Sequence, residues 1–300
     1  MQHYKKTDQT HWTGRKSDQK LYLHEKVKCI DFEHAEIGEH AKQTFAILGY
    51  ACDEGVKRNH GRIGAADGPD TIRKALAKMP NHLAEKTSLL DVGSIECSDG
   101  DMEATQTELA NMVSLLLERN IFPILVGGGH DIAYGHYKGV GNHLGLEKRI
   151  GILNFDAHFD LRSNENGNNS GTPFYQIAND CEAKGIDFKY LCLGIRPDAN
   201  DKVLFNTAKE IGARYIENER FHLSQLAYIK QEILQFMDEV DHVYTTIDLD
   251  GFSSAYAPGV SAPSPMGFPP EIVLECLKLI IDSKKLISID LAEMNPAYDI

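Results

Sequence analysis

The 300-residue sequence has no apolar run that approaches the roughly 18 residues needed to cross a bilayer. Its first residues, MQHYKKTDQTHWTGRK, lack the apolar centre of a secretory signal peptide. The six cysteines form no CxxC pair and most lie in apolar surroundings, so we interpret them as reduced structural residues. Together these absences predict a soluble, cytoplasmic protein with no membrane partner.

An excess of positive charge is also absent. The formal net charge of −13 argues against a nucleic-acid partner, because such binding depends on neutralising phosphates. It leaves a small anionic substrate open, since the local field of a pocket can oppose the global charge. No repeat, low-complexity tract or long linker divides the chain, so we expect one catalytic domain over residues 1–300, with residues 1–40 hard to assign.

Apolar, β-prone runs alternate with segments of helical spacing along the chain. The runs predict strands at 44–50, 88–92, 121–126, 150–156, 190–195, 213–216, 242–248 and 286–292. The helical segments lie at 70–79, 102–118, 174–184, 201–211, 224–240 and 270–283, with a further short helix at 34–42. This alternation predicts an α/β fold with a parallel sheet covered on both faces, and loop excursions at 52–68, 163–172 and 251–269.

Four of these strands end in acidic or histidine residues, at the carboxyl edge where open α/β sheets bind ligands. Asp156, His158 and Asp160 follow one strand at alternate positions and share a face if the extended geometry persists. Asp248 and Asp250 show the same spacing. His130 follows three glycines, which we interpret as a tight turn, because the GxxxxGK[ST] spacing of a phosphate loop is absent.

These six side chains are of the types that bind metals. Carboxylate and imidazole together suit Mn, Zn, Fe or Mg, and four carboxylates balance the charge of two divalent cations. Two ions roughly 3.5–4 Å apart can share a water and lower its pKa toward neutrality. The set therefore predicts a binuclear site that hydrolyses an electrophilic carbon or phosphorus centre. The alternative is a polar strand end without a metal.

Four motifs resemble the ureohydrolase, or arginase–agmatinase, superfamily: GGGHDIAYG at 127–135, NFDAHFDLR at 154–162, TIDLDGF at 246–252 and AEMNP at 292–296. The resemblance runs from about residue 49 to the C-terminus. It implies a three-layer α/β/α sandwich around a central parallel sheet of eight strands, and two Mn²⁺ ions per subunit. It also implies the following roles: His130 and Asp160 hold one ion, His158 and Asp250 hold the other, Asp156 and Asp248 bridge them, and Glu293 binds the cationic nitrogen group of the substrate.

The loop after the second motif distinguishes the branches of this superfamily. Arginases and agmatinases carry a proton-shuttling histidine there, whereas this chain has none between Phe159 and His222. Its SGTPF (170–174), HWTGR (11–15), GRIGAADGP (61–69) and APGVSAP (257–263) resemble the formimidoylglutamases. That branch hydrolyses N-formimidoyl-L-glutamate to L-glutamate and formamide in histidine degradation, by attack of a metal-bridging hydroxide. The alternatives are agmatinase, arginase or another guanidino-acid hydrolase, and a metal-binding protein without catalysis.

A cationic amidine with two carboxylates requires positive charge opposite Glu293. Arg162 and Arg196 follow strand ends, and the guanidinium fork suits a carboxylate, with a surface ion pair as the alternative for each. We also expect Ser170 and Thr172 to contact the substrate. Arg58 and Arg62 are weaker candidates. The hydroxyl of Thr172 has no pKa that would suit a general acid. We therefore expect Asp160 to carry the proton of the attacking hydroxide to the leaving nitrogen.

The remaining expectations concern packing and assembly. We assign His136, His143 and His242 to the surface or to packing, Trp12 and Tyr134 to packing, and Asp131 to orienting the loop of His130. The resemblance is compatible with a homo-oligomer. Relatives usually continue beyond the sequence NPAYD into one more helix, so we expect the C-terminus to be truncated.

Overall fold

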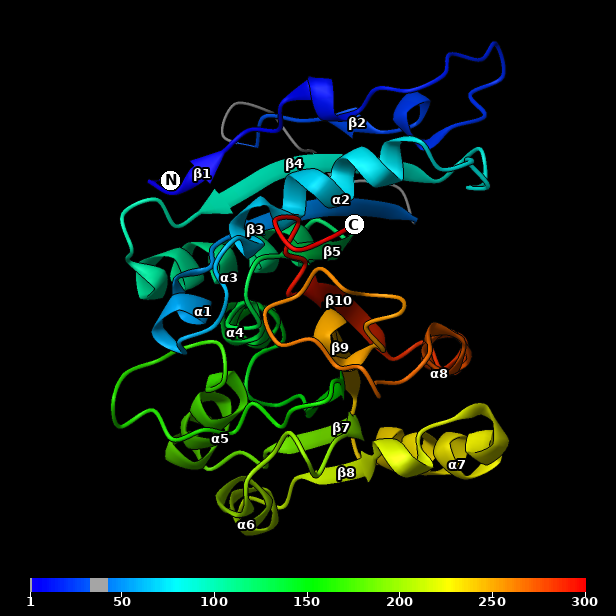
Figure 1. Cartoon of the computed structure of the whole chain (residues 1–300). Coiled ribbons are helices and arrows are strands. Elements are labelled where there is room, and N and C mark those ends of the chain that lie inside the picture. The colour runs from blue at the N-terminus through cyan, green and yellow to red at the C-terminus, as the bar shows by residue number, and fades with distance from the viewer. Residues whose placement is uncertain (1, 33–42) are drawn as a thin grey trace.

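The computed structural model describes residues 2–32 and 43–300. Ten strands in these two ranges form one sheet: β1 Tyr4–Lys5, β2 Lys28–Cys29, β3 Thr44–Ala51, β4 Ser88–Glu96, β5 Ile121–Gly127, β6 Ile150–Phe155, β7 Lys189–Ile195, β8 Arg214–Glu217, β9 His242–Asp248 and β10 Leu286–Ala292. Their order is β1-β4-β3-β5-β10-β9-β6-β7-β8, and β2 also pairs with β4. The pairs are parallel except for β1 with β4. The sheet runs through the middle of the molecule (Figure 1).

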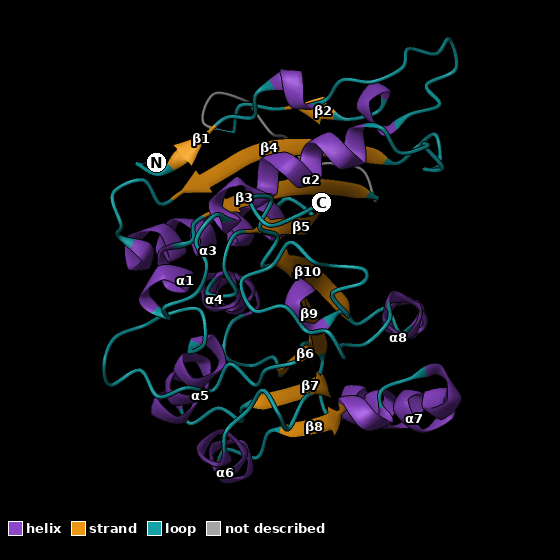
Figure 2. Cartoon of the chain, viewed as in Figure 1, coloured by secondary structure: helices purple, strands orange, loops and turns teal. Residues whose placement is uncertain are grey.

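Helices cover both faces of the sheet. They are α1 Glu54–Arg58, α2 Gly68–Ala77, α3 Met102–Glu118, α4 Ile132–Leu144, α5 Pro173–Lys184, α6 Lys202–Glu210, α7 Leu226–Asp238 and α8 Pro270–Asp282. Figure 2 shows α3, α4, α5 and α6 along one side of the strands and α7 and α8 along the other. Separate apolar clusters fill the two sides. This arrangement confirms the predicted three-layer α/β/α fold. None of the helices in the described residues is long and apolar enough to span a bilayer.

All eight predicted strands form, and they are mutually parallel. The sequence reading missed the two-residue strands β1 and β2, which extend one edge, and the helices α1 and α4. Helix α4 was missed because its glycines have low helix propensity. Those glycines allow close packing on α3, since a Cβ at Gly139 would lie 2.6 Å from the backbone oxygen of Ala110. The helix expected at 34–42 lies outside the described residues.

The N-terminal segment is anchored to β4 by buried polar groups. The carboxylate of Asp91 accepts hydrogen bonds from Nε1 of Trp12 at 2.6 Å and Nε of Arg73 at 2.8 Å. Asp91 and Arg73 are almost fully buried, so each requires the other's charge. Trp12 is thus a packing residue, as predicted, and its indole N–H also links the segment to the sheet.

Candidate metal centre

His130 enters the site from the tight loop that follows β5. A Cβ at Gly128 would lie only 1.8 Å from the backbone oxygen of Cys52, so this approach requires glycine. The N–H of Gly129 donates to the same oxygen at 2.9 Å. The two contacts hold the loop against the end of β3 and fix the position of the histidine.

Asp156, His158 and Asp160 follow β6, but not in an extended backbone. The strand ends at Phe155, the N–H of His158 donates to Oδ1 of Asp156 at 2.7 Å, and Asp160 has a φ of +49°. The expected persistence of extended geometry was therefore wrong. A turn stabilised by the Asp156 carboxylate brings the other two side chains into the site instead.

Asp248, Asp250 and Glu293 come from the ends of β9 and β10. The N–H of Asp250 donates to Oδ1 of Asp248 at 2.8 Å in a 3₁₀ turn, so these two aspartates do not share an extended backbone either. Glu293 has a φ of +66°, and its Oε1 accepts from the N–H of His130 at 2.9 Å. Strands β5, β10, β9 and β6 are neighbours, so their carboxyl ends gather all these residues at one edge.

The six predicted ligands form two groups that share one aspartate. One contains His130, Asp156, Asp160 and Asp248, and the other contains Asp156, His158 and Asp250, with ligand atoms within 4.8 Å of one another in each group. Oδ2 of Asp156 lies 3.2 Å from Nδ1 of His130, and its Oδ1 lies 3.5 Å from Nδ1 of His158. Asp156 is therefore placed to bridge two ions. Asp248 belongs to the first group alone.

Nδ1 of His130 is a buried atom without a hydrogen-bond partner, although it lies 2.9 Å from Oδ2 of Asp160 and 2.9 Å from Oδ2 of Asp248. An imidazole nitrogen surrounded by carboxylate oxygens in this way is a donor set for a divalent cation. The second imidazole, of His158, lies 3.2 Å from Oδ1 of Asp250. The residues present therefore fit a binuclear metal site.

The electrostatics of the cluster also favour cations. Burial and the charge of Asp156 raise the pKa of Asp160 to about 6. Burial and Asp248 raise the pKa of Asp250 well above its ordinary value. Burial opposes a charged His130, but Asp248, Asp156 and Asp160 outweigh it and raise the pKa of this imidazole. So many buried carboxylates ionise together only when positive charge compensates them, and two divalent ions supply it.

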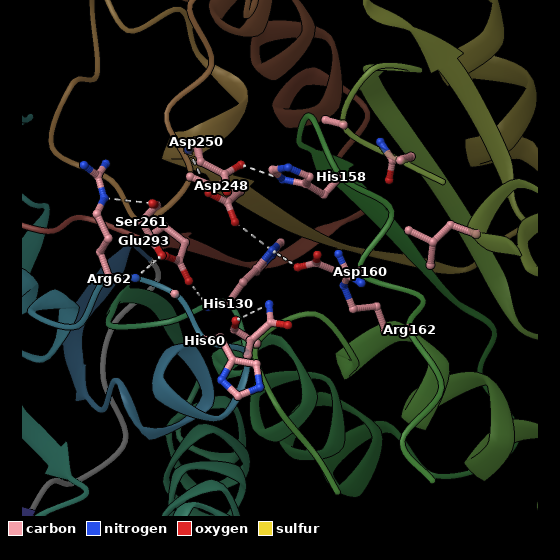
Figure 3. Close-up of a pocket in the computed structure, with 17 residues that line it drawn as sticks. His60, Arg62, His130, His158, Asp160, Arg162, Asp248, Asp250, Ser261 and Glu293 are labelled. Atoms are coloured by element: carbon pink, nitrogen blue, oxygen red, sulfur yellow. Dashed lines mark hydrogen bonds and ion pairs between the residues drawn. The ribbon is translucent and has the colours of Figure 1, made fainter. Parts of the chain in front are cut away.

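A cavity of about 340 Å³ opens above the cluster, a size suited to a small molecule. It is lined by Asn59, His60, Gly61, Arg62, His130, His158, Asp160, Arg162, Ser170, Ala199, Asn200, Leu204, Asp248, Asp250, Ser261, Ala262 and Glu293. Oε2 of Glu293 is buried and has no hydrogen-bond partner among the described residues. Burial, with Asp248 and Asp250, raises the pKa of Glu293 well above its ordinary value. Figure 3 shows this carboxylate beside the predicted ligands.

Two of the predicted substrate contacts line the cavity. Arg162 is exposed, and no described residue pairs with its guanidinium. Ser170 is buried, and its hydroxyl oxygen accepts from Nδ2 of Asn59 at 3.2 Å. Figure 3 places Arg162 on the side of Asp160 and away from Glu293. The guanidinium of Arg162 thus lies across the cavity from Glu293 (Figure 3), as a substrate with an amidinium at one end and a carboxylate at the other would require.

Two other predicted substrate contacts, Thr172 and Arg196, do not line the cavity. Thr172 is fully buried, and its hydroxyl donates to the backbone oxygen of Asn169 at 2.9 Å and accepts from Nε2 of Gln176 at 2.8 Å. The guanidinium of Arg196 is held by both carboxylate oxygens of Asp198, at 3.2 and 2.5 Å. The expectation that these two side chains touch the substrate was therefore wrong, because local partners occupy both.

The sequence reading missed several side chains in the cavity wall, of which His60 carries the most chemistry. His60 has a φ of +59° and follows α1, where the N–H of Gly61 returns to the backbone oxygen of Val56 at 2.8 Å. This is a Schellman ending with histidine in the position that usually holds glycine. Arg62, a weaker candidate, also lines the cavity, with Nε donating to the backbone oxygen of Ser261 at 3.0 Å. The sequence feature that could have indicated these residues was the loop predicted at 52–68, which contains both.

Comparisons with known proteins agree with this geometry. The model of the arginase family matches residues 43–300. A formimidoylglutamase from Geobacillus sp. strain WCH70 is 43% identical over 300 residues, covering 99% of this chain and 90% of that protein. The crystal structure of formimidoylglutamase from Bacillus subtilis superposes with a TM-score of 0.82 at 24% identity, covering 96% and 88% of the two chains. The crystal structure of Trypanosoma cruzi formiminoglutamase with Mn²⁺ superposes with a TM-score of 0.75 at 23% identity, with 89% of each chain covered.

Proposed function

Because the chain belongs to the arginase family, we propose that its cavity hydrolyses N-formimidoyl-L-glutamate to L-glutamate and formamide. Its formimidoylglutamase relatives, similar over almost their full length, support this reaction. The observation that carries the proposal is the position of Glu293: a buried carboxylate oxygen, without a hydrogen-bond partner among the described residues, beside two metal-ligand groups (Figure 3). As part of the same proposal, we assign the reaction to histidine degradation in the cytoplasm.

We propose Mn²⁺ as the metal, in line with the Mn²⁺ structure of the Trypanosoma cruzi protein. His130 and Asp160 would hold one ion and His158 and Asp250 the other. Asp156, whose two oxygens face the two groups, would bridge them together with Asp248. When bound, the two ions would supply a hydroxide nucleophile near neutral pH by lowering the pKa of a shared water.

Glu293 would bind and orient the formimidoyl group. An amidinium carries N–H donors and a positive charge, and both suit the free Oε2 of this carboxylate. The charge of the amidinium would also stabilise the ionised form of Glu293, opposing the burial that raises its pKa. The formimidoyl carbon would then lie over the ligand groups at the floor of the cavity.

Arg162 and Ser170 would hold the glutamate part. The guanidinium of Arg162 has a planar fork that fits a carboxylate and has no partner within the described residues. The hydroxyl of Ser170 accepts from Asn59, so its own proton is available to a substrate oxygen. Asp160 would take the proton of the attacking nucleophile and transfer it to the nitrogen of the departing glutamate.

A substrate panel tests the proposal. The purified protein, loaded with Mn²⁺, is assayed with N-formimidoyl-L-glutamate, agmatine, arginine and a guanidino acid, and formamide and urea are measured separately. We expect formamide from the first substrate, loss of turnover after chelation and recovery when Mn²⁺ is added. Urea from any guanidine, at a higher kcat/KM, would overturn the assignment.

A further inference from the structure

A chain of buried hydrogen bonds runs behind the candidate metal centre, on the face of the sheet that α4 covers. Oγ1 of Thr246 on β9 lies 2.9 Å from Nε2 of His130 and donates to Oδ1 of Asp290 on β10 at 2.5 Å. Oδ2 of Asp290 accepts from Nδ1 of His136 on α4 at 2.6 Å and from the hydroxyl of Tyr244. These five side chains are at most 1% exposed.

The strand geometry explains how these groups meet. Tyr244, Thr246 and Asp248 alternate along β9 and therefore share one face, with the predicted metal ligand at the end of the row. Asp290 is the register partner of Thr246 on β10. His136 lies over the row, with its ring 4.5 Å from that of Tyr244. His136 is thus a fully buried packing histidine, as one of the two alternatives predicted, and its Nδ1 also binds Asp290, which the sequence did not indicate.

Counting protons fixes the direction of each bond. An ionised carboxylate only accepts, and Asp290 has three donors around it. Burial and Asp290 raise the pKa of Tyr244 well above its ordinary value, so the phenol keeps its proton and donates. Nε2 of His136 is buried without a partner among the described residues, which places the proton of that ring on Nδ1, where it is bonded. The carboxylate of Asp290 therefore accepts three hydrogen bonds, from His136, Tyr244 and Thr246.

A threonine hydroxyl has one proton, and that of Thr246 is given to Asp290. The oxygen of Thr246 must then accept from Nε2–H of His130. An imidazole that binds a metal ion is neutral and carries one N–H, so Nδ1 of His130 is then left with the lone pair. That nitrogen is the one surrounded by the carboxylates of the first ligand group.

We propose that Asp290, held by His136 and Tyr244, sets the tautomer of His130 through Thr246 and so prepares Nδ1 to bind a divalent cation. These four are positioning residues, because none of them touches the cavity. The proposal rests on the proposed metal centre. It further states that the ion held by His130 depends on this chain, whereas the ion held by His158 and Asp250 does not.

The sharpest test removes one hydroxyl. Thr246→Val keeps the shape of the side chain but cannot accept from His130, whereas Thr246→Ser keeps the hydroxyl. Thr245→Val is the matched control, because the hydroxyl of Thr245 is equally buried on the same strand and has no hydrogen-bond partner in the described chain. Mn²⁺ binding is counted by equilibrium dialysis, with unfolding curves recorded to confirm that each variant folds.

We expect Thr246→Val to bind one of the two ions about 10–100-fold more weakly, as outer-shell substitutions typically do, and the other with unchanged affinity. Thr246→Ser and Thr245→Val should bind both ions as the unmodified protein does. Two ions bound at unchanged affinity by Thr246→Val would overturn the proposal, as would equal weakening of both ions. If the unmodified protein binds fewer than two ions, the proposed metal centre itself fails, and the inference with it.

Asp290→Asn gives a second test that reads the tautomer directly. An asparagine amide facing Thr246 donates to it, which turns the hydroxyl proton toward His130 and moves the imidazole proton to Nδ1. In protein loaded with diamagnetic Zn²⁺, ¹⁵N NMR distinguishes a metal-bound Nδ1 with a protonated Nε2 from the reverse. We expect the first pattern for His130 in the unmodified protein and its loss in Asp290→Asn. A protonated Nδ1 of His130 in the unmodified, Zn²⁺-loaded protein would overturn the proposal.

Discussion

The side chain of Glu293 accepts a hydrogen bond from the backbone N–H of His130 at 2.9 Å, across 163 positions of sequence. One carboxylate oxygen thereby holds the loop that carries a predicted metal ligand, and the other is buried in the cavity wall with no hydrogen-bond partner among the described residues. This hydrogen bond therefore links the acid proposed to bind the amidinium to the loop proposed to bind metal. Substitutions at this position separate the two roles.

Glu293→Gln should lower turnover while two metal ions stay bound. The amide oxygen still accepts from His130, but the charge that pairs with the amidinium is gone. A hydrogen bond to a charged group contributes roughly 1.5–3 kcal/mol, so kcat/KM should fall by about 10- to 100-fold. Initial rates measure the turnover, and elemental analysis of the same preparation measures the bound metal. Glu293→Ala, which also releases the His130 loop, should lose metal as well, and near-normal turnover of the glutamine variant would exclude the role.

The ligand groups predict unequal metal losses. Asp156→Ala should lose both ions, because its two oxygens face both groups, whereas His130→Ala should weaken one ion preferentially. We predict from the family resemblance that Asp248→Ala also loses both, although Asp248 belongs to the first group alone. Elemental analysis of the three variants measures how many ions each one retains. Equal losses throughout would argue against bridging.

Arg162→Lys should raise KM more than it lowers kcat. Lysine keeps the charge but loses the bidentate fork, and a charge-assisted hydrogen bond of roughly 1.5–3 kcal/mol corresponds to about a tenfold effect or more. Arg196→Lys is the control, because Asp198 already occupies that guanidinium and KM should stay the same. An unchanged KM in the Arg162 variant would remove the anchoring proposal and weaken the choice of a dicarboxylate substrate.

Sequence periodicity was sufficient for the architecture, because most of the eight parallel strands are largely buried apolar runs that end at one edge. The prediction of secondary structure failed where a tertiary contact, and not local helix propensity, determines the conformation. Helix α4 was missed for this reason, since two of its glycines, Gly135 and Gly139, are explained by the backbone of α3 beside it. The motifs predicted the ligand set, although the extended geometry expected for them was wrong. The turns after β6 and β9 place the same side chains in the site.

Side-chain partners were harder to predict than positions. The partner of Arg196 is two residues away, so the sequence RPD contained a signal for the local pair. His136 gave no such signal, because its partner Asp290 is 154 residues distant and the packing of α4 against β10 brings the pair together. His60 lay in a segment read as a loop, since a helix as short as α1 has no readable period.

Cys97 should react with iodoacetamide faster than the other cysteines. A hydrogen bond from Cys52, opposed by burial and supported by Thr105 and Gly100, lowers the pKa of Cys97 to about 7. The thiolate fraction, and hence the labelling rate, should rise as pH increases through that value. Burial raises the pKa of Cys276 to about 12, so it should stay unlabelled. Mass spectrometry after timed labelling checks this, and a fast phase that survives Cys97→Ser would contradict it.

The final prediction concerns the proton for the departing amine. Thr172→Ala should leave the chemistry intact, because the hydroxyl contacts only Asn169 and Gln176 and does not reach the cavity. It should lower the free energy of unfolding by about 1–3 kcal/mol for the lost buried hydrogen bonds. Denaturant curves and kcat on one preparation separate the two effects.

Asp160→Asn should instead nearly abolish turnover, even when excess Mn²⁺ restores the metal content. Asparagine can still ligate through its oxygen but cannot take a proton from the nucleophile and release it to the leaving nitrogen. General acid–base steps contribute roughly 10²–10⁴-fold, which sets the expected loss in kcat. A Thr172→Ala enzyme that is folded and metal-loaded, yet slowed by more than roughly a hundredfold, would show that the loop carries the proton and that Asp160 serves only as a ligand.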